Sequence, residues 1–231
     1  MSGDTAPVPI VFTINHDSRP MHHCAKDWRV ETFCSAAEFL SRPRSMVPNC
    51  LILDLGLPND DGFALQDRLA SDRPETAIIF TARREEIPAA VRAMKAGAID
   101  FLIEPVAEQT LVAAIQEAFR CSRTILEEQA RARELRARYA ALTGRERQVM
   151  ALVVKGLLNK QVGSELGISV ITVKAHRGRV MQKMGAPTFA ALVRMAAKLG
   201  LAPEKLAPQR RIQPAPFVPF VRSGAGFSLH G

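Results

Sequence analysis

Asp54 ends an apolar run, CLILD, and is followed by the turn-forming residues LGLPNDDG. This pattern is typical of a buried strand that delivers its last side chain to a loop. A carboxylate held there can accept a phosphoryl group or act as a nucleophile. Phosphotransferases and phosphatases of this kind commonly carry a second carboxylate two residues later as acid or base, and Gly56 stands there. The sequence therefore favours a phospho-acceptor position over an enzyme, and we predict no catalytic residue.

Cations gather near the other end of the chain. Residues 142–202 hold ten lysines and arginines against two glutamates, so this region alone accounts for the net charge of +8. A polyanion is the expected partner of such a region.

The residues NKQVGSELGISVITVKAHRGRV, within the same region, predict a short helix, a turn at Gly167 and a second helix after Ser169. That spacing is typical of a helix-turn-helix, whose second helix enters the major groove of DNA. We expect one apolar stripe of the second helix to face the core: Val170, Val173, Val180 and Met184.

His22, His23 and Cys24, with His16 nearby, could suggest a metal or redox site. Their spacing does not match a compact zinc site, and adjacent histidines point apart on a helix. We therefore predict no metal cofactor, free thiols for the four scattered cysteines, and a packing role for Trp28.

Five short apolar runs alternate with helix-like segments in the first half of the chain, at residues 9–14, 29–33, 50–54, 76–81 and 100–103. This alternation predicts an α/β fold with a doubly wound, parallel five-stranded sheet. Functional groups of such sheets gather at the carboxyl ends of the strands. Asp54, Thr81 and the turn at 15–17 are expected there.

A helical pattern without Gly or Pro begins near Glu108 and continues as a linker, either as a plain exposed helix or as a short coiled coil. Residues 142–202 predict a small all-α, four-helix domain, with helix caps at Thr143, Ser169 and Thr188. The last segment is dense in Pro and Gly and is expected to be disordered. The predicted boundaries are 1–122, 123–141, 142–202 and 203–231.

The residues LTGRERQVMALVVKGLLNKQVGSELGISVITVKAHRGRVMQKMGA resemble, over their entire length, the LuxR-type helix-turn-helix domain of NarL/FixJ response regulators. The resemblance implies that Lys174 and Ala175 touch base edges, whereas Gly178 lacks a lysine that some relatives use for the same purpose. It implies contacts to the DNA backbone from Asn159, Lys160, Thr172 and Arg177. It also implies that the last helix forms a dimer contact through Phe189, Leu192, Val193 and Ala196. An apolar stripe that faces the core of the same chain would show the same pattern.

The first half resembles a response-regulator receiver domain through LILDLGLPNDDG, IIFTARRE and AVRAMKAGAIDFLIEP. The resemblance makes Asp54 the phospho-acceptor, Thr81 the switch hydroxyl and Phe101 the aromatic switch. Receivers hold Mg²⁺ with the acceptor and an acidic pair after the first strand, and neutralise the phosphoryl group with a lysine.

Three positions depart from the receiver pattern. Asn15 and His16 replace the acidic pair, and Glu104 replaces the lysine. Asp17 could restore one carboxylate if the loop is shifted by one residue, so Mg²⁺ binding would rest on Asp17 and Asp54. Glu104 would still repel a phosphate at close range. We therefore predict a degenerate receiver without conventional Mg²⁺-dependent phosphorylation.

The leading hypothesis is a DNA-binding transcription regulator that works without aspartyl phosphorylation. Three alternatives stay open: a regulator controlled through phosphorylated Asp54, an aspartate-nucleophile phosphotransferase or phosphatase, and an adaptor that binds protein alone. The cations Lys174 and Arg177 argue against the adaptor. The expected partner is double-stranded DNA, as a pseudo-palindromic operator bound by a homodimer, and a cognate histidine kinase is left open. Because the sequence shows neither a membrane-spanning run nor a secretion signal, we expect a cytoplasmic protein.

Overall fold

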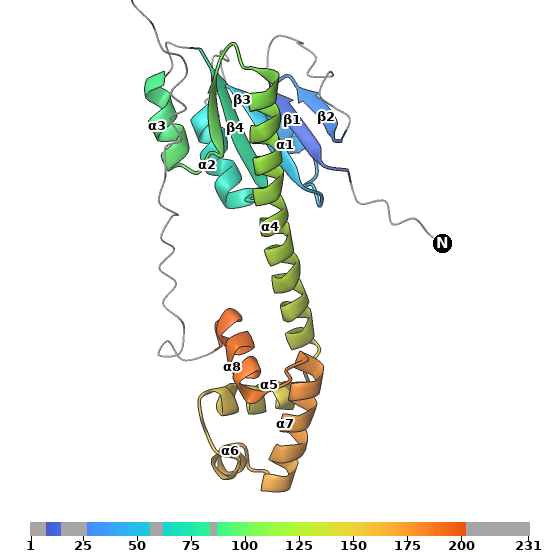
Figure 1. The fold of residues 1–231 in the computed structure, drawn as a ribbon. Helices are drawn as coiled ribbons and strands as arrows, with labels where there is room; N and C mark the ends of the chain where they lie inside the picture. Colours follow the sequence, from blue (N-terminus) through green and yellow to red (C-terminus); the bar gives the residue numbers. More distant parts are fainter. Residues whose placement is uncertain (1–7, 15–26, 56–61, 84–86, 202–231) are drawn as a thin grey trace, which may run out of the picture. The chain divides into compact units, whose positions relative to one another are not determined.

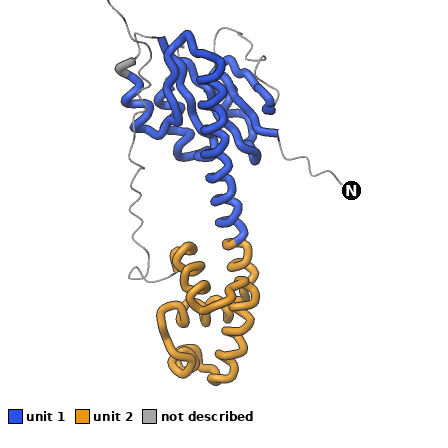
Figure 2. Tube along the Cα trace, viewed as in Figure 1, with its two compact units in different colours: residues 1–134 blue, residues 135–231 orange. Residues whose placement is uncertain are grey.

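The computed structural model describes residues 8–14, 27–55, 62–83 and 87–201 of the chain. These residues form two compact units, within residues 1–134 and 135–231 (Figure 2). Several predictions lie outside the described residues: those for Asn15, His16, Asp17, His22, His23, Cys24 and Gly56, and for the segment 203–231.

The first unit is built on a parallel sheet of five strands in the order β2-β1-β3-β4-β5 (Figure 1). The strands are β1 Ile10–Ile14, β2 Arg29–Phe33, β3 Asn49–Asp54, β4 Thr76–Ala82 and β5 Asp100–Ile103. Each strand falls on one of the five apolar runs, so the predicted doubly wound α/β fold is confirmed.

Within the described residues, four helices belong to this unit in whole or in part: α1 Ala36–Ser41, α2 Gly62–Asp72, α3 Ile87–Lys95 and the first part of α4 Glu108–Ala140. Alternate residues of a strand point to opposite faces of the sheet. Phe12 and Leu53 accordingly share a core with α1, α2 and α3, whereas Val11 and Ile52 share another with α4. The parallel sheet is therefore covered on both faces.

Trp28 is buried on the α4 face, and its ring centroid lies 5.9 Å from that of Phe119. The predicted packing role is confirmed. Among the described residues Cys34, Cys50 and Cys121 are free thiols, and burial raises the pKa of the Cys50 thiol above its ordinary value.

Helix α4 continues without a break from Glu108 to Ala140, across the boundary between the two units. Its first half buries Ala114, Ile115, Ala118, Phe119 and Ser122 against the sheet. Leu135 and Tyr139, near its end, pack against the core of the second unit. The helix thus contributes side chains to both cores.

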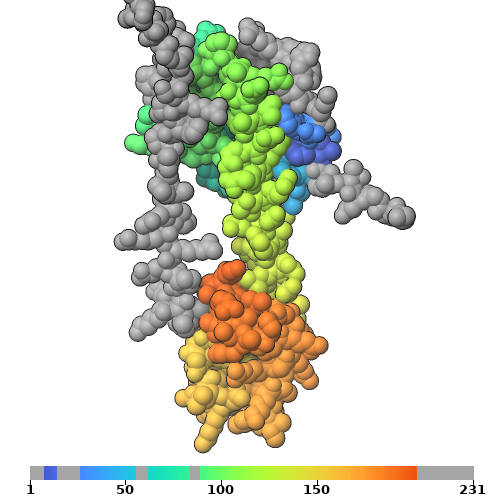
Figure 3. Space-filling model, in the orientation of Figure 1, coloured from blue at the N-terminus to red at the C-terminus, as the bar shows by residue number. Residues whose placement is uncertain are grey.

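The second unit also contains α5 Gly144–Val154, α6 Asn159–Leu166, α7 Val170–Met184 and α8 Phe189–Lys198. Figure 3 shows α8, in orange-red, at the surface of this unit. Thr143, Ser169 and Thr188 each accept a backbone hydrogen bond at the start of a helix, so the three predicted caps are confirmed.

One core prediction for α7 is wrong. Val173, Val180 and Met184 are buried as expected, but 39% of Val170 is exposed. Val170 is the first residue of the helix, so no preceding turn of α7 covers it.

Candidate phosphoryl site and nucleic-acid interface

Asp54 and Thr81 are direct neighbours across two strands. The two residues are register partners at the carboxyl ends of β3 and β4, and both are half-buried. The backbone N–H of Leu55 donates to the carbonyl of Thr81 over 3.0 Å, which extends the pairing by one residue. The structure therefore brings the predicted acceptor and the predicted switch hydroxyl to one edge of the sheet.

Phe101, the predicted aromatic switch, is half-buried in β5. Its ring centroid lies 6.5 Å from that of Phe80, which in turn lies 5.8 Å from Phe63 of α2. The ring of Phe101 is thus one end of an aromatic row on the face covered by α1, α2 and α3.

Glu104 follows β5 and is exposed. Its backbone N–H donates to the carbonyl of Ala82 over 2.9 Å, and the Glu104–Pro105 peptide bond is cis. Ala82 follows Thr81 directly, and β4 and β5 are paired neighbours in the sheet. Glu104, which follows β5, is therefore next to the end of the strand that carries the predicted switch hydroxyl. The residue predicted at the position of the receiver lysine is therefore a glutamate at the end of β5.

Within the described residues, the donor set at this edge does not fit the Mg²⁺ chemistry of a receiver. Within the described ranges it consists of one carboxylate at the acceptor position and one at the lysine position, without a neutralising cation in the latter place. Among those residues, no group of three or more His, Cys, Asp or Glu side chains could hold a metal ion.

A buried carboxylate lies at the opposite ends of the strands, which sequence reasoning missed. Glu75 is 2% exposed and accepts hydrogen bonds from Arg44 Nε (3.0 Å) and Nη2 (2.8 Å) and from Gln129 Nε2 (3.1 Å). Although burial raises the pKa of Glu75, these hydrogen bonds hold it below its ordinary value. Ser122 of α4 donates to the carbonyl of Glu75 over 2.6 Å and accepts from the N–H of Asn49. This cluster attaches α4 to the sheet.

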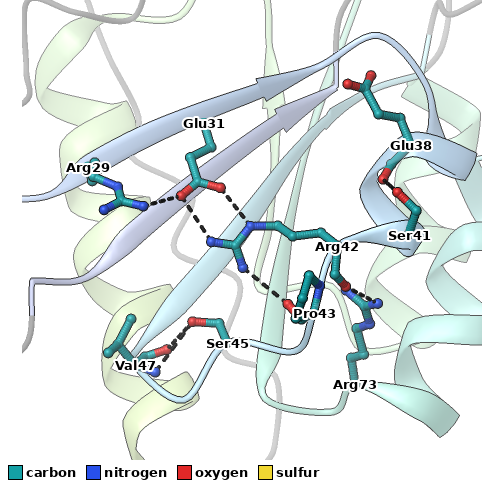
Figure 4. A network of polar contacts seen from close by, with 9 residues as sticks. All are labelled: Arg29, Glu31, Glu38, Ser41, Arg42, Pro43, Ser45, Val47 and Arg73. Carbon is teal, nitrogen blue, oxygen red and sulfur yellow. Dashed lines mark hydrogen bonds and ion pairs between the residues drawn. The ribbon is translucent and has the colours of Figure 1, made fainter.

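A second polar network surrounds Glu31 on β2 (Figure 4). Arg42 donates from Nε over 2.6 Å and from Nη2 over 2.9 Å, and Arg29 donates over 2.7 Å. The hydrogen bonds from Arg42 lower the pKa of Glu31, with a smaller contribution from Arg29. The Arg42 guanidinium also lies 4.7 Å from the centre of the Phe12 ring. The network is satisfied internally and serves to hold the edge strand.

In the second unit, the turn between α6 and α7 depends on two glycines. Gly167 ends α6 with φ of 64°, a conformation that side-chain-bearing residues rarely adopt. A Cβ atom on Gly163 would stand 2.8 Å from the carbonyl oxygen of Ile168. The backbone N–H of Ile168 also donates a hydrogen bond to the carbonyl of Gly163. The turn can fold back this closely onto α6 because position 163 has no side chain.

The predicted base-reading positions lie on the exposed side of α7. Lys174, Ala175 and Gly178 are exposed, and a Cβ atom on Gly178 would meet nothing within 4 Å. Thr172 is half-buried, and its hydroxyl lies 2.9 Å from that of Ser169. Lys160 is exposed at the start of α6.

Arg177 and Asn159, both predicted to contact the DNA backbone, are bound to each other. Arg177 Nη1 donates to Asn159 Oδ1 over 3.0 Å, and its guanidinium lies 4.8 Å from the centre of the Phe189 ring. One half-buried arginine therefore joins α6, α7 and α8.

The four candidates for a dimer contact do not share an exposed face. Leu192 and Ala196 are fully buried in the core of their own unit, and Val193 is half-buried. Phe189 is 38% exposed. The core-stripe alternative therefore holds for Leu192 and Ala196. Of the four side chains, only that of Phe189 is substantially exposed.

One of the ten cations of residues 142–202 is paired with a buried carboxylate. Lys183 Nζ donates to Glu146 Oε2 over 2.7 Å, and Glu146 is 2% exposed. The Lys183 ammonium and the N–H of Thr143 together lower the pKa of Glu146 to about 2. The sequence predicted the cap at Thr143, but not the contact between Glu146 and its partner in α7.

Two known protein families match the chain, one within each of the two compact units. Residues 21–116 match the family described as "Response regulator receiver domain", and residues 140–196 match "Bacterial regulatory proteins, luxR family".

Relatives with the same combination cover most of the chain. Nodulation protein W of Bradyrhizobium diazoefficiens is 43% identical over 198 residues, which are 84% of this chain and 87% of that protein. The transcriptional regulatory protein FixJ of the same organism is 36% identical over 74% of this chain and 84% of its own. The chain belongs to the NarL/FixJ-type response regulators. As a member of this family it is a DNA-binding transcriptional response regulator and not an enzyme.

Two further proteins support the assignment to the NarL/FixJ-type regulators. The response regulator protein TmoT of Ectopseudomonas mendocina is 41% identical over 74% of this chain and 78% of its own. A solved structure of the response regulator StyR aligns with a TM-score of 0.70 at 36% identity, over 83% of this chain and all of that one. None of the described helices is long and apolar enough to cross a membrane.

Proposed function

We propose that this regulator binds a pseudo-palindromic operator as a homodimer in the cytoplasm, and that its affinity for DNA does not depend on Mg²⁺-dependent phosphorylation of Asp54. The observation that carries the second part is the position of Glu104. A conventional receiver neutralises the incoming phosphoryl group at this place with a lysine. Glu104 instead adds a negative charge beside the end of β4.

A phosphoryl group near Glu104 would meet a charge of its own sign. Like charges at close range repel, although solvent weakens the repulsion at an exposed side chain such as Glu104. A phosphoryl group on Asp54 would gain no compensating cation from position 104. Asn15 and His16 supply an amide and an imidazole where Mg²⁺ prefers carboxylates.

On the DNA side, the exposure of α7 supports Lys174 and Ala175 as base-contacting residues. Lys160, Thr172 and the linked pair of Arg177 and Asn159 are the proposed backbone contacts. Such contacts position the protein on DNA and make affinity dependent on salt, whereas base contacts determine which sequence is preferred.

A phosphorylation-controlled regulator is the second candidate, in which a histidine kinase or a small phosphodonor modifies Asp54. The register pairing of Asp54 with Thr81 favours it, because the acceptor and its switch hydroxyl keep the arrangement of a receiver.

Intact mass spectrometry after incubation with acetyl phosphate and Mg²⁺ separates the two candidates. We expect no phosphoryl adduct on the wild-type chain, while a conventional receiver in the same tube is modified. Asp54→Asn is the matched control. A Mg²⁺-dependent adduct that the Asp54→Asn variant lacks would establish the second candidate, and the Glu104→Lys variant would then be expected to form it faster.

A further inference from the structure

The exposed side of α7 carries one large apolar side chain among the proposed DNA contacts. Ile171 is 80% exposed, the highest value among the large hydrophobic side chains of the described residues. A single exposed hydrophobic residue is ordinary on a protein surface. Ile171, however, lies beside the predicted base-reading residues of α7.

Ile171 belongs to the helical stripe of the predicted base-reading residues. Positions 171, 174, 175 and 178 have the spacing i, i+3, i+4 and i+7, which places them on one side of a helix. All four are exposed, while Val173, Val180 and Met184 are buried on the other side. A surface that receives DNA at Lys174 and Ala175 therefore also meets Ile171.

The first turn of α7 is fixed around this side chain. Ser169 accepts from the N–H of Thr172 over 3.1 Å, and the two hydroxyls are 2.9 Å apart. The β-branched side chain of Ile171 itself has few allowed rotamers in a helix. The apolar group is consequently presented in a defined direction at the end of the helix that enters a groove.

The major groove offers one apolar group to such a side chain, the C5-methyl of thymine. We propose that Ile171 is a specificity-determining residue that contacts a thymine methyl next to the base pair read by Lys174. Three residues of helix rise by about 4.5 Å, close to the spacing of one to two base pairs. The thymine is thus placed within two base pairs of the Lys174 contact, once in each half of a two-fold operator. This inference rests on the proposed role of α7 in reading bases.

The test removes the methyl group from the DNA and the side chain from the protein. The full-length chain selects its preferred sequence from a pool of random duplexes, and each thymine of that sequence is then replaced by deoxyuridine. We expect one such replacement per half-site to weaken wild-type binding about fourfold, the value of one buried methyl-sized group. The Ile171→Ala variant should bind the thymine and deoxyuridine duplexes equally, and its fold, measured by circular dichroism, should be unchanged because the side chain is exposed.

Val91→Ala is the matched control, since Val91 is also β-branched and is 60% exposed but lies in the first unit, away from α7. It should keep the wild-type sensitivity to deoxyuridine. If the wild type selects a sequence but responds to no deoxyuridine, or if Ile171→Ala responds as the wild type does, the role of Ile171 is refuted while base reading by α7 stands. If the wild type selects no sequence, both are refuted.

Discussion

Arg177 in α7 donates a hydrogen bond of 3.0 Å to the side chain of Asn159 at the first position of α6. The same guanidinium lies over the ring of Phe189 at the start of α8. Arg177 and Asn159, which the sequence suggests as separate DNA contacts, are therefore hydrogen-bonded to each other. The half-buried arginine holds α6 against α7.

Arg177→Ala and Asn159→Ala should each weaken DNA binding, and the double variant should lose less than the sum of the two losses. The expected coupling is about 1 kcal/mol, as for residues in direct contact. Anisotropy titrations with the selected duplex in a double-mutant cycle measure it. The exposed neighbour Arg179 serves as the control, because Arg179→Ala should add independently to Asn159→Ala. If the losses of binding free energy in Arg177→Ala and Asn159→Ala also add fully, the hydrogen bond between the two residues does not contribute to DNA binding.

The pair of Glu146 and Lys183 should make the second unit sensitive to acid. The pKa of Glu146 is lowered from 4.5 to about 2, so the stabilisation is present above its unfolded pKa and is lost as the pH falls from 4.5 toward 2. Glu146→Gln should lower stability near neutral pH by about 2 kcal/mol and flatten the loss of stability in that acid window. Denaturant titrations followed by circular dichroism check both effects, with the exposed Glu165 replaced by Gln as control. An unchanged acid response in Glu146→Gln would contradict the assignment.

The cluster around Glu75 should determine how firmly α4 is attached to the sheet. Glu75→Gln leaves Arg44 without its charged partner and should destabilise the first unit by about 2 kcal/mol. Trp28 reports this unit alone, since it is the single tryptophan and packs against Phe119 of α4. Its fluorescence should show an earlier unfolding midpoint in denaturant. The exposed Glu128→Gln should leave the midpoint in place, and an equal shift in both variants would show that the cluster is not responsible.

Two helical glycines should respond in opposite directions to the same substitution. Gly163→Ala places a Cβ atom 2.8 Å from the Ile168 carbonyl and should destabilise the helix-turn-helix and weaken DNA binding. Gly178→Ala meets nothing within 4 Å and should stabilise α7 by roughly 0.5–1 kcal/mol. Thermal unfolding followed by circular dichroism compares them. A stabilising effect of Gly163→Ala would mean that the turn is looser than described.

Local patterns explain why so much of the fold could be predicted. The strands follow from apolar runs with turn signals at their ends, and the caps at Thr143, Ser169 and Thr188 follow from chemistry within three residues of each helix start. Helix α1 was missed because it has only six residues. Its signal was nevertheless present, since Ser35 and Glu38 form a cap in which each accepts from a backbone N–H near the other.

The contacts that could not be predicted join residues far apart in the chain. Arg177 and Asn159 are 18 positions apart, and Lys183 and Glu146 are 37 apart. Helical periodicity also places Leu192 and Ala196 on an apolar stripe without saying which surface covers it, and that surface is the core of the same unit. A long-range partner depends on how helices pack, which periodicity alone does not contain.

The central claim is that affinity for DNA does not respond to phosphorylation chemistry at Asp54. Its direct test is the affinity of the full-length chain for its selected duplex, with and without acetyl phosphate and Mg²⁺, beside the Asp54→Asn variant in the same conditions. We predict that all four affinities agree within about twofold, below the usual range of allosteric coupling. A rise of about fivefold or more on treatment of the wild type, absent in Asp54→Asn, would contradict the account and make Asp54 a working phosphoryl switch.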